Sequence, residues 1–193
     1  METEINIVEI LKDKPANTKL YSPLFSEVFF SHVSGGYIAV EHHGGTSLFL
    51  SSGRFYDYDG SEPLLFPSKE MRDWSKFAWE KGDVLVSKDN VYIIFEKFED
   101  DTYTRFKGKH YLWKECDEED YNKEETKMLT SVFEKATDDV AQTYIKTIEE
   151  HLDGKLNLET LEIEKQLEFK DGDIVVYGES VAICRRFYKH TLS

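Results

Sequence analysis

The chain has 193 residues, of which 40% are hydrophobic and 14% aromatic, and it carries a formal net charge of −14. A chain of this length can bury a core without disulfide or metal cross-links, and the aromatic share favours β structure. The charge argues against nucleic acid as a direct partner, because a phosphate backbone is met by clustered lysine and arginine.

Two features of the sequence predict a cytoplasmic protein. The N-terminal residues include acids and no apolar run of signal-peptide length, and nothing approaches the ~20 consecutive apolar residues of a membrane span. Cys116 and Cys184 lie far apart, and neither has a second cysteine or a histidine at ligand spacing. We therefore expect no membrane partner, no metal and no cofactor, and the oligomeric state stays open.

Residues 1–77 are predicted to form a β-barrel-like module. Residues 5–11 form a short amphipathic segment. Period-two patterns separated by glycine and proline turns then predict five or six short strands, at 19–21, 27–30, 37–40, 47–50, 53–56 and 64–66. So few residues hide their strand edges best in a curled sheet of SH3-like or similar barrel type. We expect Trp74 and Phe77, one helical turn apart, to close the end of this barrel.

Residues 78–193 are predicted to form an α+β module that begins and ends with related hairpins. Residues 81–94 and 171–184 align without a gap, with a Gly-Asp pair ahead of each first strand. A repeated supersecondary unit indicates duplication of a small fold. We expect hairpins over 80–113 and 170–188, and we expect the two related copies to come together in space.

The region between these copies is predicted to hold a further hairpin, a loop and two helical patterns. Residues 103–113 predict a hairpin that turns at Lys107-Gly108. Residues 115–125 are rich in acids that repel one another, which favours an exposed loop. Residues 123–135 either extend the main helix backwards or form a separate one.

The main helix is predicted over residues 137–152. Apolar residues recur at steps of three and four, Thr137 suits the N-cap, and Gly154 stands where a helix-ending glycine is expected. An extended or hairpin segment follows at 156–164. The predicted fold class is therefore α+β and predominantly β, with small SH3-like antiparallel barrels and one long helix packed on the second β unit.

One distinctive block of the sequence runs from Leu65-Phe66-Pro67-Ser68-Lys69 to Arg72-Asp73-Trp74-Ser75-Lys76-Phe77. This block and further stretches, about half of the chain together, resemble uncharacterised proteins of gut Bacteroidales and their phages or mobile elements. This resemblance carries no known activity. It implies repeated modules and an accessory protein of a mobile element rather than a metabolic enzyme.

The usual catalytic and metal-binding patterns are absent from the sequence. It contains no P-loop, no G-x-S-x-G, no paired C-x-x-C and no H-E-x-x-H. His42 and His43 point to opposite faces of a strand, although one of them could pair with His32. Asp83 and Asp173 recur at the same place of the repeat, where an aspartate commonly hydrogen-bonds its own turn. The pattern favours a non-catalytic protein over an enzyme.

Arg54, Tyr56 and Tyr58 are the candidate binding residues. They lie in the loop-like segment GRFYDYDG, where an arginine among tyrosines and aspartates is typical of a recognition surface. SH3-like barrels bind peptides on exposed aromatic patches, for which Tyr21, Phe25, Tyr37 and Phe55 are further candidates.

The leading hypothesis from the sequence is an accessory protein that docks a protein or peptide. One alternative is an acidic mimic of nucleic acid that inhibits a host DNA- or RNA-binding protein, although simple solubility also explains the acidity. Another is a small-ligand binder or enzyme with its site between the two modules.

Overall fold

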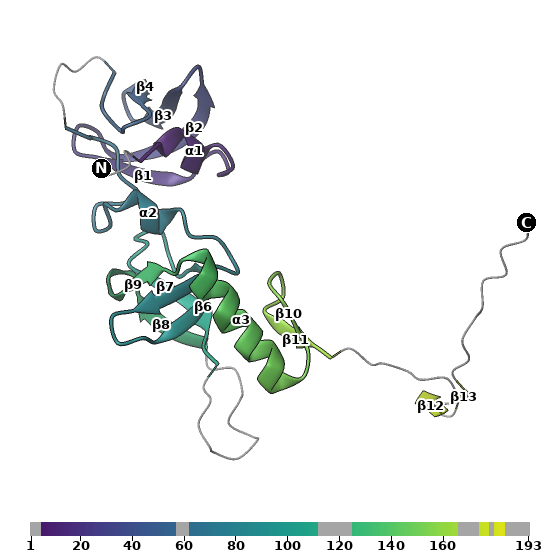
Figure 1. The fold of residues 1–193 in the computed structure, drawn as a ribbon. Helices are drawn as coiled ribbons and strands as arrows, with labels where there is room; N and C mark the ends of the chain where they lie inside the picture. The colour runs from purple at the N-terminus through teal and green to yellow at the C-terminus, as the bar shows by residue number, and fades with distance from the viewer. Residues whose placement is uncertain (1–4, 57–61, 112–124, 166–173, 178–179, 184–193) are drawn as a thin grey trace, which may run out of the picture.

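A computed structural model describes residues 5–56, 62–111, 125–165, 174–177 and 180–183. These residues are mostly β, in a four-stranded and a five-stranded antiparallel sheet with few helices, which confirms the predicted α+β, predominantly β class. Figure 1 shows the two sheets at either side of the short helix α2.

The four-stranded sheet has the strand order β1-β2-β3-β4. Its strands are Lys19–Ser22, Ser26–Ser34, Tyr37–His42 and Gly45–Leu50. Strand alternation sends Leu20, Val28, Ile38 and Phe49 into one core, together with Ile7 and Leu11 of helix α1 (Ile7–Leu11). The opposite face of the sheet has no helix or second sheet against it among the described elements.

The segment after β4 bonds to both edges of this sheet. Phe55 forms an antiparallel bridge with Phe49 of β4, and Phe66 forms one with Tyr21 of β1. The last two strands expected from the sequence are therefore short bridges rather than full strands.

Helix α2 (Trp74–Phe77) closes the core of the four-stranded sheet. The Asp73 side chain accepts a hydrogen bond from the backbone N–H of Ser75, which caps the helix. Trp74 and Phe77 are both buried, and the indole N–H of Trp74 donates to the carbonyl of Leu65. The pair lies in the core, as its spacing predicted.

The five-stranded sheet has the order β8-β7-β6-β5-β9. Its strands in chain order are Val84–Ser87, Tyr92–Phe98, Arg105–Lys109, Glu125–Leu129 and Phe133–Lys135. Val84 and Ile94 pack under helix α3 (Asp138–Leu152), whereas Leu85 and Ile93 lie on the other face among Trp79, Phe95, Phe106 and Phe133. Both faces of this sheet are therefore covered.

The predicted hairpin turn at Lys107-Gly108 is wrong. Strand β7 runs straight through both residues and pairs with β6 on one side and β8 on the other. A Cβ at Gly108 would lie 2.5 Å from Cγ2 of Ile93 and 2.6 Å from the carbonyl oxygen of Ile94. This glycine therefore permits close approach of two strands instead of a turn.

The helical interpretation of residues 123–135 is also wrong. Strand β8 occupies Glu125–Leu129, a single 3₁₀ turn follows at Thr130–Val132, and β9 begins at Phe133. The acidic loop expected at 115–125 lies outside the described residues, apart from Glu125 itself.

Helix α3 (Asp138–Leu152) confirms the strongest helical pattern of the sequence. Thr137 is the N-cap residue, although its side chain makes no capping hydrogen bond. The left-handed residue after the helix is Asp153, with φ of 48°, and not the expected Gly154. Gly154 instead lies against the next hairpin, where a Cβ would meet Ile163 and the carbonyl oxygen of Glu164.

Two small hairpins follow α3. Strands β10 (Lys155–Asn157) and β11 (Glu162–Glu164) form the hairpin expected at 156–164, and β10 lies against α3. Strands β12 (Ile174–Tyr177) and β13 (Ser180–Ile183) form the expected C-terminal hairpin.

The two related hairpins differ in register and in neighbours. Val84 pairs with Ile94 in the first, whereas the matching Ile174 pairs with Ile183 in the second. β5 and β6 lie inside the five-stranded sheet, and β12 and β13 form a separate two-stranded sheet. The expected association of the two copies is thus not seen in their strand pairing.

Side chains of the five-stranded unit reach into the four-stranded unit at their junction. Tyr103, between β6 and β7, is buried in the core of the four-stranded sheet and donates from its hydroxyl to the carbonyl of Lys19 at 3.0 Å. In the other direction, Lys76 of α2 donates to the carbonyls of Thr130 and Phe133 and pairs with Glu134 at 2.7 Å. The predicted boundary between residues 77 and 78 therefore runs through a packed junction.

Candidate functional site

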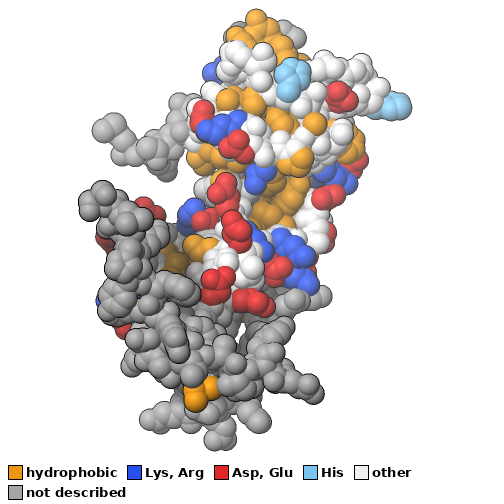
Figure 2. Space-filling view, turned by 90° about the vertical axis from the view of Figure 1, so that its right-hand side faces the viewer, with side chains coloured by type: hydrophobic (Ala, Val, Ile, Leu, Met, Phe, Trp, Pro, Cys, Tyr) orange, Lys and Arg blue, Asp and Glu red, His pale blue; other side chains and the backbone are white. Residues whose placement is uncertain are grey.

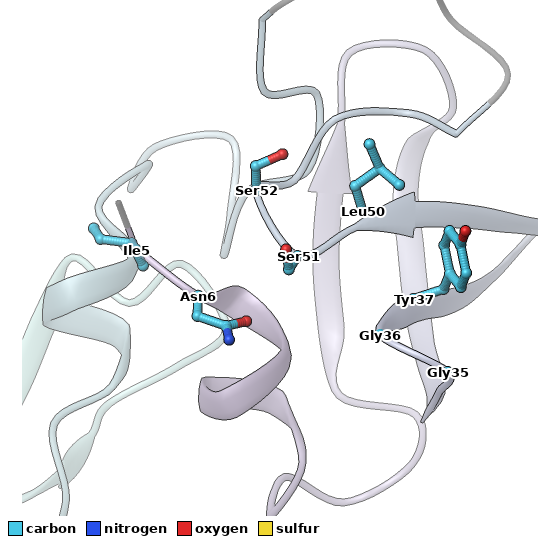
Figure 3. A pocket seen from close by; sticks show the side chains of 8 residues that line it. All are labelled: Ile5, Asn6, Gly35, Gly36, Tyr37, Leu50, Ser51 and Ser52. Atoms are coloured by element: carbon cyan, nitrogen blue, oxygen red, sulfur yellow. The ribbon is translucent and has the colours of Figure 1, made fainter. Parts of the chain in front are cut away.

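The candidate site is a groove beside the uncovered face of the four-stranded sheet, with a volume of about 490 Å³. We call it the Tyr37 groove, and its lining residues are Ile5, Asn6, Gly35, Gly36, Tyr37, Leu50, Ser51 and Ser52. Figure 3 shows Ile5 on one side of the groove and Tyr37 with Leu50 on the other, with Ser51 and Ser52 between them. Its lining combines the side chains of Ile5, Tyr37 and Leu50 with the polar Asn6, Ser51 and Ser52 and the backbone of the glycine turn.

The β2–β3 turn builds one end of the groove. Gly35 and Gly36 both have positive φ, 58° and 83°, as a tight two-residue hairpin turn requires. The turn sets Ser34 opposite Tyr37, and the next ladder sets Tyr37 opposite Leu50. Tyr37 and Leu50 therefore stand side by side on the uncovered face.

A second turn brings α1 against the end of β4. The backbone N–H of Ile7 donates to the carbonyl of Ser51 at 2.8 Å. Gly53 has φ of 80°, and a Cβ on it would lie 2.9 Å from Cδ1 of Ile7. Only glycine fits this crowded left-handed position, which holds Ile5 and Asn6 opposite Leu50.

An aromatic pair lies at the Tyr37 side of the groove. The rings of Tyr37 and Tyr56 meet edge to face, with centroids 5.2 Å apart and an interplanar angle of 85°. Tyr56 is 52% exposed, and Leu48 on the neighbouring strand is 40% exposed. The backbone N–H of Tyr56 donates to the carbonyl of Leu48, which joins these apolar groups into one surface.

The structure places one of the three candidate binding residues, Tyr56, on this surface. Phe55 bridges Phe49 and packs against Phe25, and the half-buried Arg54 beside it is not among the residues that line the groove. The carbonyl of Arg54 accepts a hydrogen bond from the N–H of Leu50. Tyr58 lies outside the described residues.

Sequence reasoning named Tyr37 among the further candidates for an aromatic patch, but it did not single out Leu50 or Ile5. The alternation of side chains along β3 and β4 could have indicated that Tyr37 and Leu50 face away from the core. Ile5 reaches the groove only through the contact between α1 and Ser51, for which the sequence gives no local signal.

The histidines do not form a joint site. His42 stacks on Phe25 with centroids 4.0 Å apart, accepts at Nδ1 from the N–H of Gly44 and therefore donates from Nε2 to Ser47. His32 is paired with Ala39 in the sheet, away from His42. Within the described residues, no group of three histidine, cysteine, aspartate or glutamate side chains could hold a metal ion.

Asp83 behaves as a turn aspartate. Its carboxylate accepts a hydrogen bond from the N–H of Glu80 at 2.9 Å and pairs with Lys135 at 2.7 Å. The first contact holds the turn before β5, and the second ties that turn to β9. Asp173, its counterpart in the second copy, lies outside the described residues.

Many acidic side chains of the described chain are next to bases. Carboxylates at positions 9, 27, 83, 96, 99, 134, 149 and 150 each lie within ion-pair distance of a lysine or arginine. Figure 2 shows acids and bases interleaved over the middle of one face. This mixture differs from a row of carboxylates that would imitate phosphates.

No protein-family model, curated protein or solved structure matches the chain. None of the helices that the structure describes is long and apolar enough to cross a membrane. The site must therefore be interpreted from its own geometry.

Proposed function

We propose that the protein is a non-catalytic binding protein that docks a peptide segment of a partner protein in the Tyr37 groove. The observation that carries the proposal is the edge-to-face pair of the half-buried Tyr37 and the exposed Tyr56 beside the Tyr37 groove. Aromatic side chains held at such a position give large contact area for little loss of side-chain entropy.

The backbone around the groove supports this function. The β2–β3 turn and the Gly53 turn fix both ends of the site, so that little ordering is required when a ligand binds. We further propose that the four strands and the bridges at Phe55 and Phe66 form a small SH3-like barrel. The bonds of the 53–66 segment to both sheet edges favour that architecture.

The charge distribution favours peptide binding over mimicry of nucleic acid. A mimic requires unpaired carboxylates spaced along one face, and many of the described carboxylates are paired with bases. The junction between the two units is filled by the side chains of Phe77, Phe98 and Tyr103, which leaves the Tyr37 groove as the better ligand site.

A selection of random displayed peptides against the full chain tests the proposal. Enriched peptides are synthesised, and their affinities are measured by fluorescence anisotropy for the wild type and for Tyr56→Ser. Loss of this aromatic anchor should weaken binding by about tenfold or more. Leu158→Ser, at an exposed apolar position of the other unit, is the matched control and should bind as the wild type does.

Peptides that bind Tyr56→Ser and the wild type equally well would place the ligand elsewhere and contradict the proposal. Failure to enrich any saturable peptide ligand would contradict it as well.

A further inference from the structure

The polar side chains that line the Tyr37 groove have hydrogen-bonding groups that the protein does not use. The amide oxygen of Asn6 accepts from the N–H of Val8 at 3.2 Å, and its amide nitrogen donates to no other described residue. The hydroxyls of Ser51, Ser52 and Tyr37 likewise bond to no described residue. Figure 3 shows Asn6 at one side of the groove and the two serines in its middle. The groove therefore offers several donors and acceptors to a ligand.

No side chain that lines the groove is a cation or a carboxylate. The lining consists of aliphatic, phenol, hydroxyl and amide groups and of two glycines. A charged ligand group that entered the groove would lose water without meeting an opposite charge, which costs free energy. Main-chain amides and uncharged side chains lose less, because the free hydroxyls and the amide can replace the water that they give up.

The shape of the groove suits a short stretch of extended chain. A Cβ added to Gly36 would meet no heavy atom within 4 Å, so that no side chain separates a ligand main chain from the turn. Ile5 and Leu50 face each other from opposite sides, which leaves an aliphatic position between them. The volume of about 490 Å³ lies in the range of sites for drug-sized ligands, and a few peptide residues have that size.

We propose that the groove binds an uncharged stretch of an extended peptide, through the main chain of that stretch and one aliphatic side chain. This inference rests on the proposed peptide-binding function and specifies its ligand. The aliphatic side chain lies between Ile5 and Leu50. The amide nitrogen of Asn6 donates to a carbonyl of the ligand, and the hydroxyls of Ser51 and Ser52 bond to its neighbouring main-chain groups.

Asn6→Asp tests the main-chain contact with little effect on the fold. Aspartate is as good an N-cap as asparagine, so its carboxylate still accepts from the N–H of Val8. The substitution replaces the amide donor by a charge that repels a ligand carbonyl. Thr143→Glu adds the same charge at an exposed position of α3 and is the matched control. Thermal unfolding verifies that both variants keep the fold.

The experiment uses the full chain and peptides enriched by the selection against it. Each peptide position is replaced in turn by lysine, glutamate and glutamine, and affinities are measured by fluorescence anisotropy at low and at moderate salt. We expect a short run of consecutive positions at which lysine and glutamate both weaken binding by about tenfold or more, glutamine weakens it less, and salt has little effect. Asn6→Asp should weaken binding of the unchanged peptides by about tenfold, and Thr143→Glu by less than about twofold.

The outcomes separate this inference from the proposed function. Peptides that accept lysine or glutamate at every position, or that bind Asn6→Asp as tightly as the wild type, would overturn the inference, while loss of binding by Tyr56→Ser would still uphold the function. Full binding by Tyr56→Ser, or a selection that enriches no peptide, would overturn both.

Discussion

The four-stranded and the five-stranded sheets differ in what lies against their second face. In β5 and β6 the successive residues Val84-Leu85 and Ile93-Ile94 are all buried, because α3 covers one face and an aromatic cluster covers the other. In β4 the buried Phe49 alternates with the exposed Leu48, because nothing described covers the outward face there. Sheets of similar size thus differ in how much apolar surface they bury, and the uncovered face is the one to which the proposed function assigns recognition.

The largest difference in stability is expected between truncation of an aliphatic side chain over the covered five-stranded sheet and truncation of one on the uncovered face of the four-stranded sheet. Ile148 of α3 is fully buried over the five-stranded sheet, and Ile148→Ala should lower the free energy of unfolding by about 2–5 kcal/mol. Leu48→Ala on the uncovered face should change it by less than about 1 kcal/mol. Urea unfolding followed by circular dichroism measures both, and equal losses would show that the outward face is covered in solution.

Alkaline pH should act on both units through two buried tyrosines. Burial raises the pKa of Tyr103 to about 12, with a further contribution from Asp101, and burial likewise raises the pKa of Tyr144 to about 12. The ordinary value is 10.0, so the unfolded chain loses these protons first, and the stability present below pH 10 falls as the pH rises toward 12. Each tyrosine should contribute about 2–3 kcal/mol to this loss.

Tyr103→Phe and Tyr144→Phe should each flatten the decline in unfolding free energy between pH 10 and 12. Tyr103 lies in the core of the four-stranded sheet, and Tyr144 of α3 lies in the core between that helix and the five-stranded sheet, so the two substitutions compare the two cores directly. A decline that keeps its wild-type steepness in both variants would be inconsistent with burial as its cause.

A substitution at the junction of the two units should lower the free energy of unfolding less than a substitution in either core. Lys76→Met keeps the length of the side chain but removes the donor to the carbonyls of Thr130 and Phe133, and we expect a loss of about 1–3 kcal/mol. Lys146→Met is the control, because its ion pair with Glu150 is exposed and should contribute less than about 1 kcal/mol. Thermal unfolding compares them, and a Lys76→Met protein as stable as Lys146→Met would contradict the importance of this contact.

The smallest expected effect is a fall in the free energy of unfolding at acid pH, caused by His110 at the end of β7. Burial lowers the pKa of His110 below its ordinary value of 6.5, so below that pH the unfolded chain binds the proton more readily than the folded one. The contribution of His110 to stability is complete above pH 6.5 and declines as the pH falls. His110→Gln should show a weaker decline between pH 7.5 and 5 by chemical unfolding, and an unchanged one would exclude His110 as its source.

Sequence patterns predicted the elements that are determined by neighbouring residues. They failed where a contact between residues far apart in the chain determines the local structure. The Gly35-Gly36 turn and the three-and-four spacing of α3 are read from neighbours in the chain, and both are found. Gly108 was misread as a turn because its cause is contact with Ile93 and Ile94. The strand at 125–129 was missed because its pairing with β7 overrides a helical composition.

The candidate site was predictable only in part for the same reason. Arg54 and Tyr56 follow a glycine and alternate with Phe55, a pattern visible in the sequence. Their setting was not visible, since Tyr37 joins Tyr56 through the β3–β4 ladder and Ile5 arrives through α1. Whether these residues bind a ligand stays a prediction for the peptide experiments.

The reciprocal contacts at the junction have a consequence for cooperativity. Tyr103 donates to Lys19 in one unit, and Lys76 donates to Thr130 and Phe133 in the other, so neither sheet can open without exposing buried groups of its neighbour. The two sheets should consequently melt in a single transition, and their amide protons should exchange with solvent through a shared opening. A ligand in the Tyr37 groove would then protect β5 and β6 from exchange, although it touches neither strand.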